Sequence, residues 1–134
     1  MAGPVSHHKT LVVGKNMYLI GGSMHGKEYT CSQMYRLDLN TLNWDMVKTR
    51  GEKAPHGSLD EHTADLNGDT IVIFGGFIDG TRENKVFTFD VKTFTWGLIE
   101  PADAAKPVPS ARAGHSASLL KGSLYIFGGK DDHN

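Results

Sequence analysis

The sequence Ile71-Val72-Ile73-Phe74-Gly75-Gly76 joins four consecutive apolar residues to a pair of glycines. Short runs of β-branched and aromatic residues favour a buried strand, and glycine ends such a strand sharply. The same arrangement occurs at residues 17–22 and 124–129, so the Gly-Gly pairs lie 54 and 53 residues apart (75 − 21 and 128 − 75). Three copies at one period indicate a repeat, and its glycine pairs are Gly21-Gly22, Gly75-Gly76 and Gly128-Gly129.

A histidine precedes each pair by the same distance. His8, His62 and His115 each stand thirteen residues before the first glycine of their pair (21 − 8, 75 − 62 and 128 − 115). Between each histidine and the apolar run lies a short segment rich in glycine or asparagine, residues that accept the positive φ of a tight hairpin turn. Each repeat is therefore predicted to open with a β-hairpin.

The second half of the repeat occurs twice, at residues 34–44 and 86–96. Each copy alternates apolar and polar residues, passes through a polar turn and reaches a tryptophan, Trp44 or Trp96. This pattern predicts a second hairpin and hence four antiparallel strands per repeat. No stretch sustains the apolar spacing of an amphipathic helix, so the fold class predicted is all-β.

These features resemble the kelch repeat, which builds the blades of a β-propeller. The Gly-Gly pair after the second strand, Phe89 and Trp96 seven residues later match the family pattern in the second repeat. In the first repeat Trp44 matches, whereas Leu37 stands where the family usually has tyrosine. The resemblance extends from His7 to the C-terminus and implies kelch-type blades of four antiparallel strands.

The repeats divide the 134 residues, taken as one domain, into a blade at 7–55, a blade at 56–107 and a half-blade at 108–134. Propellers of this type close with about 4 to 8 blades, so the resemblance implies an incomplete ring. The outermost blade faces are then exposed apolar patches, which predicts self-association or completion by missing blades. Aromatic residues at the strand positions are expected to pack between blades, namely Tyr18, Trp44, Phe74, Trp96, Tyr125 and Phe127.

Composition limits the classes of partner. The formal net charge is −1 and the apolar fraction 39%, which favours neither nucleic acid nor an anionic membrane. The longest apolar runs are only a few residues, whereas a transmembrane helix needs about 20. Cys31 is the single cysteine, and the first residues lack the pattern of a secretory signal. A cytoplasmic location is therefore expected.

Catalytic and metal-binding chemistry finds little support. His8, His62 and His115 repeat with the blades, which favours a structural contact, and no local Cys/His cluster predicts a metal. Asp38 and Asp90 repeat in phase at strand ends, where a turn role is expected. We therefore predict no enzyme activity and no cofactor. Two alternatives stay open: a fragment of a propeller enzyme resembling copper oxidases, or a short propeller chain that assembles with itself.

The connections between strands carry the candidate binding residues, because recognition on a rigid scaffold concentrates in loops. The long connections are residues 23–32 and 77–83 between second and third strands, and 49–61 and 101–114 between blades. In kelch propellers such loops form the usual partner-binding face, so the resemblance implies a non-catalytic module of an intracellular adaptor or scaffold. It would bind a protein or peptide. Arg112 is the leading candidate, with an inter-blade or surface role as its alternative; the others are His25, Tyr29, Lys53, His56, Asp79, Arg82 and Ser110.

Overall fold

The first blade is a four-stranded antiparallel sheet. A computed structural model of the protein describes residues 4–24 and 33–133, and all regular elements in this part of the chain are strands. The sheet has the order β1 (Lys9–Val13), β2 (Asn16–Ile20), β3 (Met34–Asp38) and β4 (Trp44–Val47). The two hairpins predicted from the sequence are therefore present.

The second blade repeats this sheet. Its strands lie in the order β6 (Thr63–Asn67), β7 (Thr70–Phe74), β10 (Val86–Asp90) and β11 (Thr95–Ile99). The register is also repeated, because Leu37 pairs with Trp44 in the first blade as Phe89 pairs with Trp96 in the second. The all-β, kelch-type fold expected from the sequence is confirmed.

The third unit contains one hairpin, formed by β12 (Ser116–Leu120) and β13 (Ser123–Phe127). In the other two units the equivalent of β13 pairs on its outer side with a third strand. Among the described residues β13 has no such neighbour. An apolar cleft of about 430 Å³ lies beside this hairpin, lined in part by Leu98, Leu124 and Ile126. The ring is therefore open, as the sequence predicted.

The connection between β7 and β10 differs from the expected loop. It forms a small hairpin of β8 (Phe77–Ile78) and β9 (Thr81–Arg82), which pairs with β5 (Leu59–Asp60) in a three-stranded sheet. Asp79 occupies the turn with a φ of 48° and accepts a hydrogen bond from the backbone N–H of Ser58 at 3.0 Å. Segment 77–83 is thus ordered by backbone pairing.

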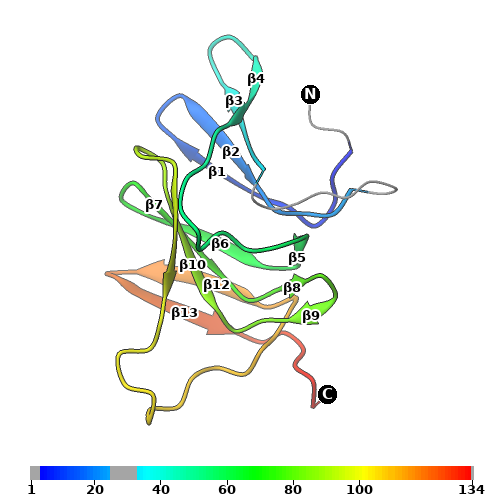
Figure 1. Ribbon diagram of the computed structural model, residues 1–134, viewed down its shortest axis with the longest axis vertical. Coiled ribbons are helices and arrows are strands. Elements are labelled where there is room, and N and C mark those ends of the chain that lie inside the picture. Colours follow the sequence, from blue (N-terminus) through cyan, green and yellow to red (C-terminus); the bar gives the residue numbers. More distant parts are fainter. Residues whose placement is uncertain (1–3, 25–32, 134) are drawn as a thin grey trace.

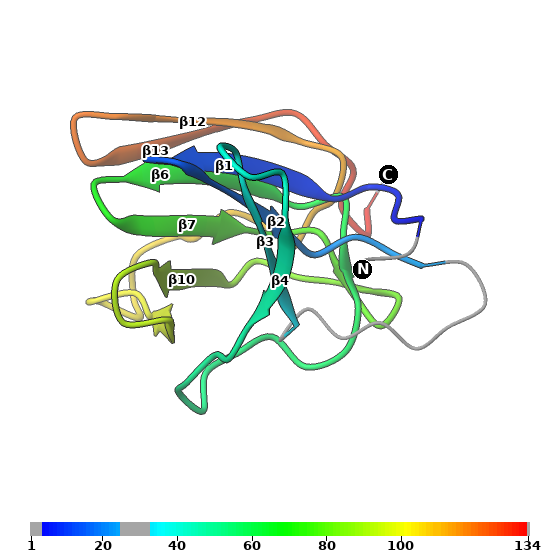
Figure 2. The same cartoon turned by 90° about the horizontal axis from the view of Figure 1, so that it is seen from above.

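The three units are arranged like successive blades around a common side. The first strands β1, β6 and β12 lie next to one another, with β6 in the middle. Figure 1 shows the turns of the three first hairpins on one side of the molecule and the small β5–β8–β9 sheet on the other. The view from above shows the turns of the β6–β7 and β12–β13 hairpins on the same side (Figure 2). The β8–β9 hairpin therefore lies on the side opposite these turns.

The core lies mainly between the first and second blades. Tyr18 and Ile20 of β2 belong to the same buried cluster as Ile71, Phe89 and Trp96 of the second blade. The Phe89 and Trp96 rings are tilted with centroids 5.0 Å apart. Burial of each large apolar side chain contributes about 1.5–3 kcal/mol, so this interface is the main source of stability in the described chain.

The exposed aromatic residues depart from the packing expected for them. Trp96 is 3% exposed, but its repeat equivalent Trp44 is 37% exposed. Tyr125 and Phe127 of β13 are 62% and 81% exposed. These three side chains lie on the two outermost blade faces, which no further blade covers within the described residues. Their packing between blades, predicted from the sequence, is absent for this reason.

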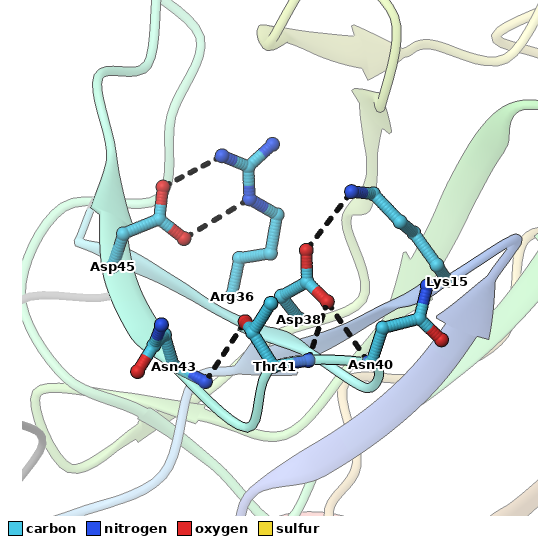
Figure 3. A network of polar contacts seen from close by, with 7 residues as sticks. All are labelled: Lys15, Arg36, Asp38, Asn40, Thr41, Asn43 and Asp45. Carbon is cyan, nitrogen blue, oxygen red and sulfur yellow. Dashed lines mark hydrogen bonds and ion pairs between the residues drawn. The ribbon is translucent and has the colours of Figure 1, made fainter.

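Polar turns close the outer hairpins in both complete blades. Asp38 accepts hydrogen bonds from the N–H groups of Asn40 and Thr41, and Lys15 lies 3.0 Å from its second carboxylate oxygen (Figure 3). Lys15 and the two N–H groups lower the pKa of Asp38 to about 2. Asp90 makes the equivalent backbone contacts, and Leu42 and Phe94 complete the two turns with φ of 57°.

Candidate functional site

A cleft of about 370 Å³ with a mixed polar and apolar lining lies beside the β8–β9 hairpin. We call it the loop cleft. Its walls come from the first strand connection of the second blade, the β8–β9 hairpin and the start and end of the half-blade. The residues that line it are Glu61, Phe77, Arg82, Ala113, Gly114, Gly129 and Lys130.

Backbone pairing fixes the walls of the loop cleft. The N–H of Gly114 donates to the Glu61 carbonyl at 3.1 Å, which joins the half-blade to the second blade. Ala113 and Lys130 exchange two backbone hydrogen bonds, of 3.1 and 2.9 Å. The cleft is therefore bounded by hydrogen-bonded backbone from three separate stretches of the sequence.

Arg82 is the predicted site residue that lines this cleft. Its guanidinium lies 4.9 Å from the centroid of the Phe77 ring, and Nη1 donates to a carboxylate oxygen of Asp132 at 2.8 Å. Nε of Arg82 is buried and has no hydrogen-bond partner within residues 4–24 and 33–133. One donor of a fixed, charged group is thus unused at the cleft wall.

Arg112 lies beside the loop cleft, and its guanidinium donates hydrogen bonds to Ser110 and Gly128. Its Nη1 donates to the Gly128 carbonyl at 3.0 Å, Nη2 to the Ser110 hydroxyl at 2.9 Å, and Nε to the Ser110 carbonyl at 3.2 Å. The Ser110 hydroxyl in turn donates to Asp131 at 3.0 Å. The backbone N–H of His133 and the Ser110 hydroxyl lower the pKa of Asp131. These contacts link the connection 101–114 to the end of β13.

The remaining predicted binding residues do not line the cleft. Lys53 and His56 are exposed on the connection between the first two blades, and Asp79 lies at the tip of the β8–β9 hairpin. His25 and Tyr29 lie outside the described residues. The structure thus brings Arg82 into the cleft, places Arg112 and Ser110 next to it, and leaves Lys53, His56 and Asp79 outside it.

Sequence reasoning missed three of the charged or aromatic residues in the cleft wall. Glu61 immediately precedes the repeated His62, and Phe77 immediately follows Gly75-Gly76. Lys130 stands one position after Gly129, which is the place of Phe77 in the preceding repeat. Phase alignment of the repeats could have drawn attention to these positions, because residues that flank invariant elements of the repeat lie at the same end of the blades.

The repeated histidines lie at the boundaries between blades. His62 is 1% exposed, and burial together with nearby Lys9 lowers the pKa of its imidazole to about 3, while the Ile20 carbonyl opposes this shift. Nε2 of His115 lies 3.0 Å from the Thr63 hydroxyl. Within the part of the chain that the structure describes, no three His, Cys, Asp or Glu side chains form a group able to hold a metal ion.

Comparison with known proteins identifies the class. The KLHDC2/KLHL20/DRC7 Kelch-repeats domain matches residues 7–134, nearly the whole chain. Together with the two blades and the repeated glycine pairs, this match shows that the chain belongs to the kelch-repeat family. Kelch repeats generally serve as protein-interaction modules.

Individual relatives support the same assignment. Kelch domain-containing protein 3 of Homo sapiens is 32% identical over 131 residues, which cover 91% of this chain and 33% of that protein. Host cell factor of Drosophila melanogaster is 29% identical over 128 residues, covering 86% of this chain and 8% of that protein. The chain therefore spans about a third of the length of the first relative and far less of the second.

In residues 4–24 and 33–133 no helix has the length and apolar character needed to cross a bilayer.

Proposed function

We propose that this chain is a non-catalytic module of an intracellular, cytoplasmic adaptor or scaffold, and that it binds a protein or peptide through the loop cleft. The observation that carries the proposal is the Arg82 guanidinium, which lies over Phe77 in the wall of a cleft bounded by both kinds of connection, those within a blade and those between blades. Binding residues on kelch scaffolds are expected in these connections.

The chemistry of the cleft wall supports a peptide ligand. Phe77 offers an aromatic face, although Arg82 already covers part of it. Arg82 and Lys130 offer donors, and the Glu61 carboxylate offers an acceptor. A peptide that brings a carbonyl or carboxylate oxygen to the accessible part of the Arg82 guanidinium, a basic group to Glu61 and an apolar side chain to Phe77 matches all three. Water exclusion by such a ligand strengthens each polar contact.

Arg112 and Ser110 have a supporting place in this proposal. Their hydrogen bonds hold the connection 101–114 against the end of β13, next to the cleft wall at Ala113 and Gly129. Loss of Arg112 would therefore move the wall as well as remove a charge. Lys53, His56, Asp79, His25 and Tyr29 remain candidate contacts for parts of a partner that extend beyond the cleft.

The test is selection of peptides from a random display library on the immobilised 134-residue chain. Selected peptides are then measured against substituted variants of the chain. We expect Arg82→Ala and Arg82→Lys to weaken binding by about tenfold or more, because lysine keeps the charge but lacks the planar guanidinium that lies on Phe77. Lys121→Ala, an exposed change in the β12–β13 turn outside the cleft, is the control and should leave the affinity unchanged.

Two results would overturn the proposal. One is a set of selected peptides that bind the Arg82→Ala and Glu61→Ala variants as well as they bind the unaltered chain. The other is a peptide affinity that falls in the Lys53→Ala variant but is unchanged in the Arg82→Ala variant. Circular dichroism spectra that match for all variants would assign the loss of binding to the cleft rather than to unfolding.

A further inference from the structure

The contact between successive blades has a repeated element that places a histidine on a glycine. A Cβ atom on Gly21 would lie 2.6 Å from Cε1 of His62, and one on Gly75 would lie 2.8 Å from Cε1 of His115. No side chain fits at such distances, so the histidine of each following blade occupies the space that glycine leaves. We call the space beside the first glycine of each pair, at Gly21, Gly75 and Gly128, the glycine socket.

A backbone hydrogen bond accompanies each occupied socket. The N–H of Gly22 donates to the carbonyl of Leu59 at 2.6 Å, and the N–H of Gly76 donates to the carbonyl of Arg112 at 2.8 Å. Leu59 and Arg112 each stand three residues before the socket histidine. The same two contacts therefore join the first blade to the second and the second to the half-blade.

The third socket is empty in the described chain. No described residue lies within 4 Å of the Cβ position of Gly128, although its φ of 71° resembles that of Gly21 and Gly75. The side chains beside it are exposed, in contrast to their buried equivalents Tyr18 and Ile20 on the first blade. We call this surface the tail face; it consists of Leu120, Tyr125, Phe127 and Gly128.

The opposite end of the chain presents the matching surface. In the register of the two sheets, the row Val12, Met17, Leu37 and Trp44 corresponds to the row Leu66, Ile71, Phe89 and Trp96. The second row packs against the first blade in the core. The first row has no blade against it in the described chain, and Trp44 and Met46 are exposed. We call this surface the head face; it consists of Val12, Met17, Leu37, Trp44 and Met46, with His8 at its edge.

We propose that the tail face of one chain packs on the head face of a second copy, with His8 of that copy seated in the Gly128 socket. This contact continues the interface that the chain already forms twice within itself. The N–H of Gly129 would donate to the carbonyl of Val5, which stands three residues before His8 as Leu59 stands before His62. The interaction uses the blade faces and is independent of peptide binding in the loop cleft.

Two copies are the expected closed assembly. The contact joins unlike surfaces, so it continues until a ring closes. Each copy supplies three blade positions, and two copies supply six, within the range of about 4 to 8 over which propellers close. A second copy in a closed ring therefore covers both the head face and the tail face of the first copy. A single head-to-tail contact would leave one of these faces exposed.

The first test is the molar mass of the purified chain by size-exclusion chromatography with light scattering over a dilution series. A dimer of 29.2 kDa, twice the 14.6 kDa of the chain, is expected. Gly128→Ala should weaken dimerisation by about tenfold or more, since the added Cβ occupies the site of the His8 ring. Gly122→Ala is the matched control, because Gly122 has a φ of 78° and equally open surroundings among the described residues but lies outside the socket.

The second test establishes that head meets tail. Met46→Glu alters only the head face and Phe127→Glu only the tail face, and both side chains are more than half exposed in the single chain. Each variant alone should be monomeric, whereas an equimolar mixture should contain dimers joined through the one unaltered head and the one unaltered tail. A monomeric unaltered chain would overturn the proposal. So would dimers that survive either single substitution, or a mixture that stays monomeric.

Discussion

The buried imidazole of His62 makes the stability of the fold depend on pH in a defined window. Its pKa is lowered to about 3, whereas a histidine in the unfolded chain has a pKa near 6.5. Between these two pH values the imidazole is protonated in the unfolded state and neutral in the folded state, so unfolding takes up one proton. The contribution of His62 is complete above pH 6.5 and is lost progressively as the pH falls toward 3.

The size of the effect follows from proton linkage. Each pH unit within the window removes about 1.4 kcal/mol from the free energy of unfolding, so the change from pH 7 to pH 5 is about 2 kcal/mol for this one side chain. His62 is 1% exposed, so solvent screening reduces this value little. His115 has its pKa lowered in the same direction, mainly by burial, and adds to the total.

The assay is urea unfolding at half-unit steps from pH 7 to pH 5, for the unaltered chain and for His62→Gln. The variant is expected to be less stable at pH 7 but to lose about 2 kcal/mol less over the range, because it lacks the titrating ring. Parallel slopes for the two proteins would refute the reasoning. An imidazole resonance of His62 that titrates near pH 6.5 in the folded protein would refute it directly.

Three further predictions concern stability. Gly21→Ala should cost about 2–4 kcal/mol and Gly14→Ala only about 1 kcal/mol, because both have φ near 60° but only Gly21 has a neighbouring ring, and urea unfolding measures the difference. Trp96→Ala should cost about 3–5 kcal/mol, whereas Trp44→Ala should cost clearly less in the monomer; equal losses in thermal unfolding would contradict the assigned burial. Asp38, with its pKa lowered to about 2, stabilises the fold above about pH 4 and loses this effect toward pH 2, so Asp38→Asn should flatten the acid limb of the unfolding curve.

Much of the fold could be predicted because the repeat carries its own register. The glycine pairs and the alternating segments that end in Trp44 and Trp96 predicted antiparallel sheets of four strands, which the structure contains. The β8–β9 hairpin could not be predicted, since its strands of two residues carry no periodicity and depend on pairing with β5. Exposure of Trp44 also depends on a neighbour rather than on the local sequence.

The candidate site was less accessible to sequence reasoning. Arg82 was identified from its loop, but Glu61 and Lys130 are 69 positions apart (130 − 61) and line one cleft only after the second blade and the half-blade are placed. Arg112 is the leading candidate from sequence because it follows Pro109-Ser110-Ala111, where many kelch repeats carry arginine, and a guanidinium there could bind a carboxylate or phosphate. In the structure its three donor contacts go to its own loop and to Gly128, a geometry that the amino-acid type alone does not reveal.

Within residues 4–24 and 33–133 no strand pairs with the outer edge of β13, and this has a practical consequence for handling the 134-residue chain. A strand that leaves a row of N–H and C=O groups without partners is a template for any extended peptide, including another molecule of the same protein. The alternating apolar residues Leu124 and Ile126 beside the adjoining apolar cleft make such an addition favourable. Storage at high concentration therefore favours cross-β aggregates.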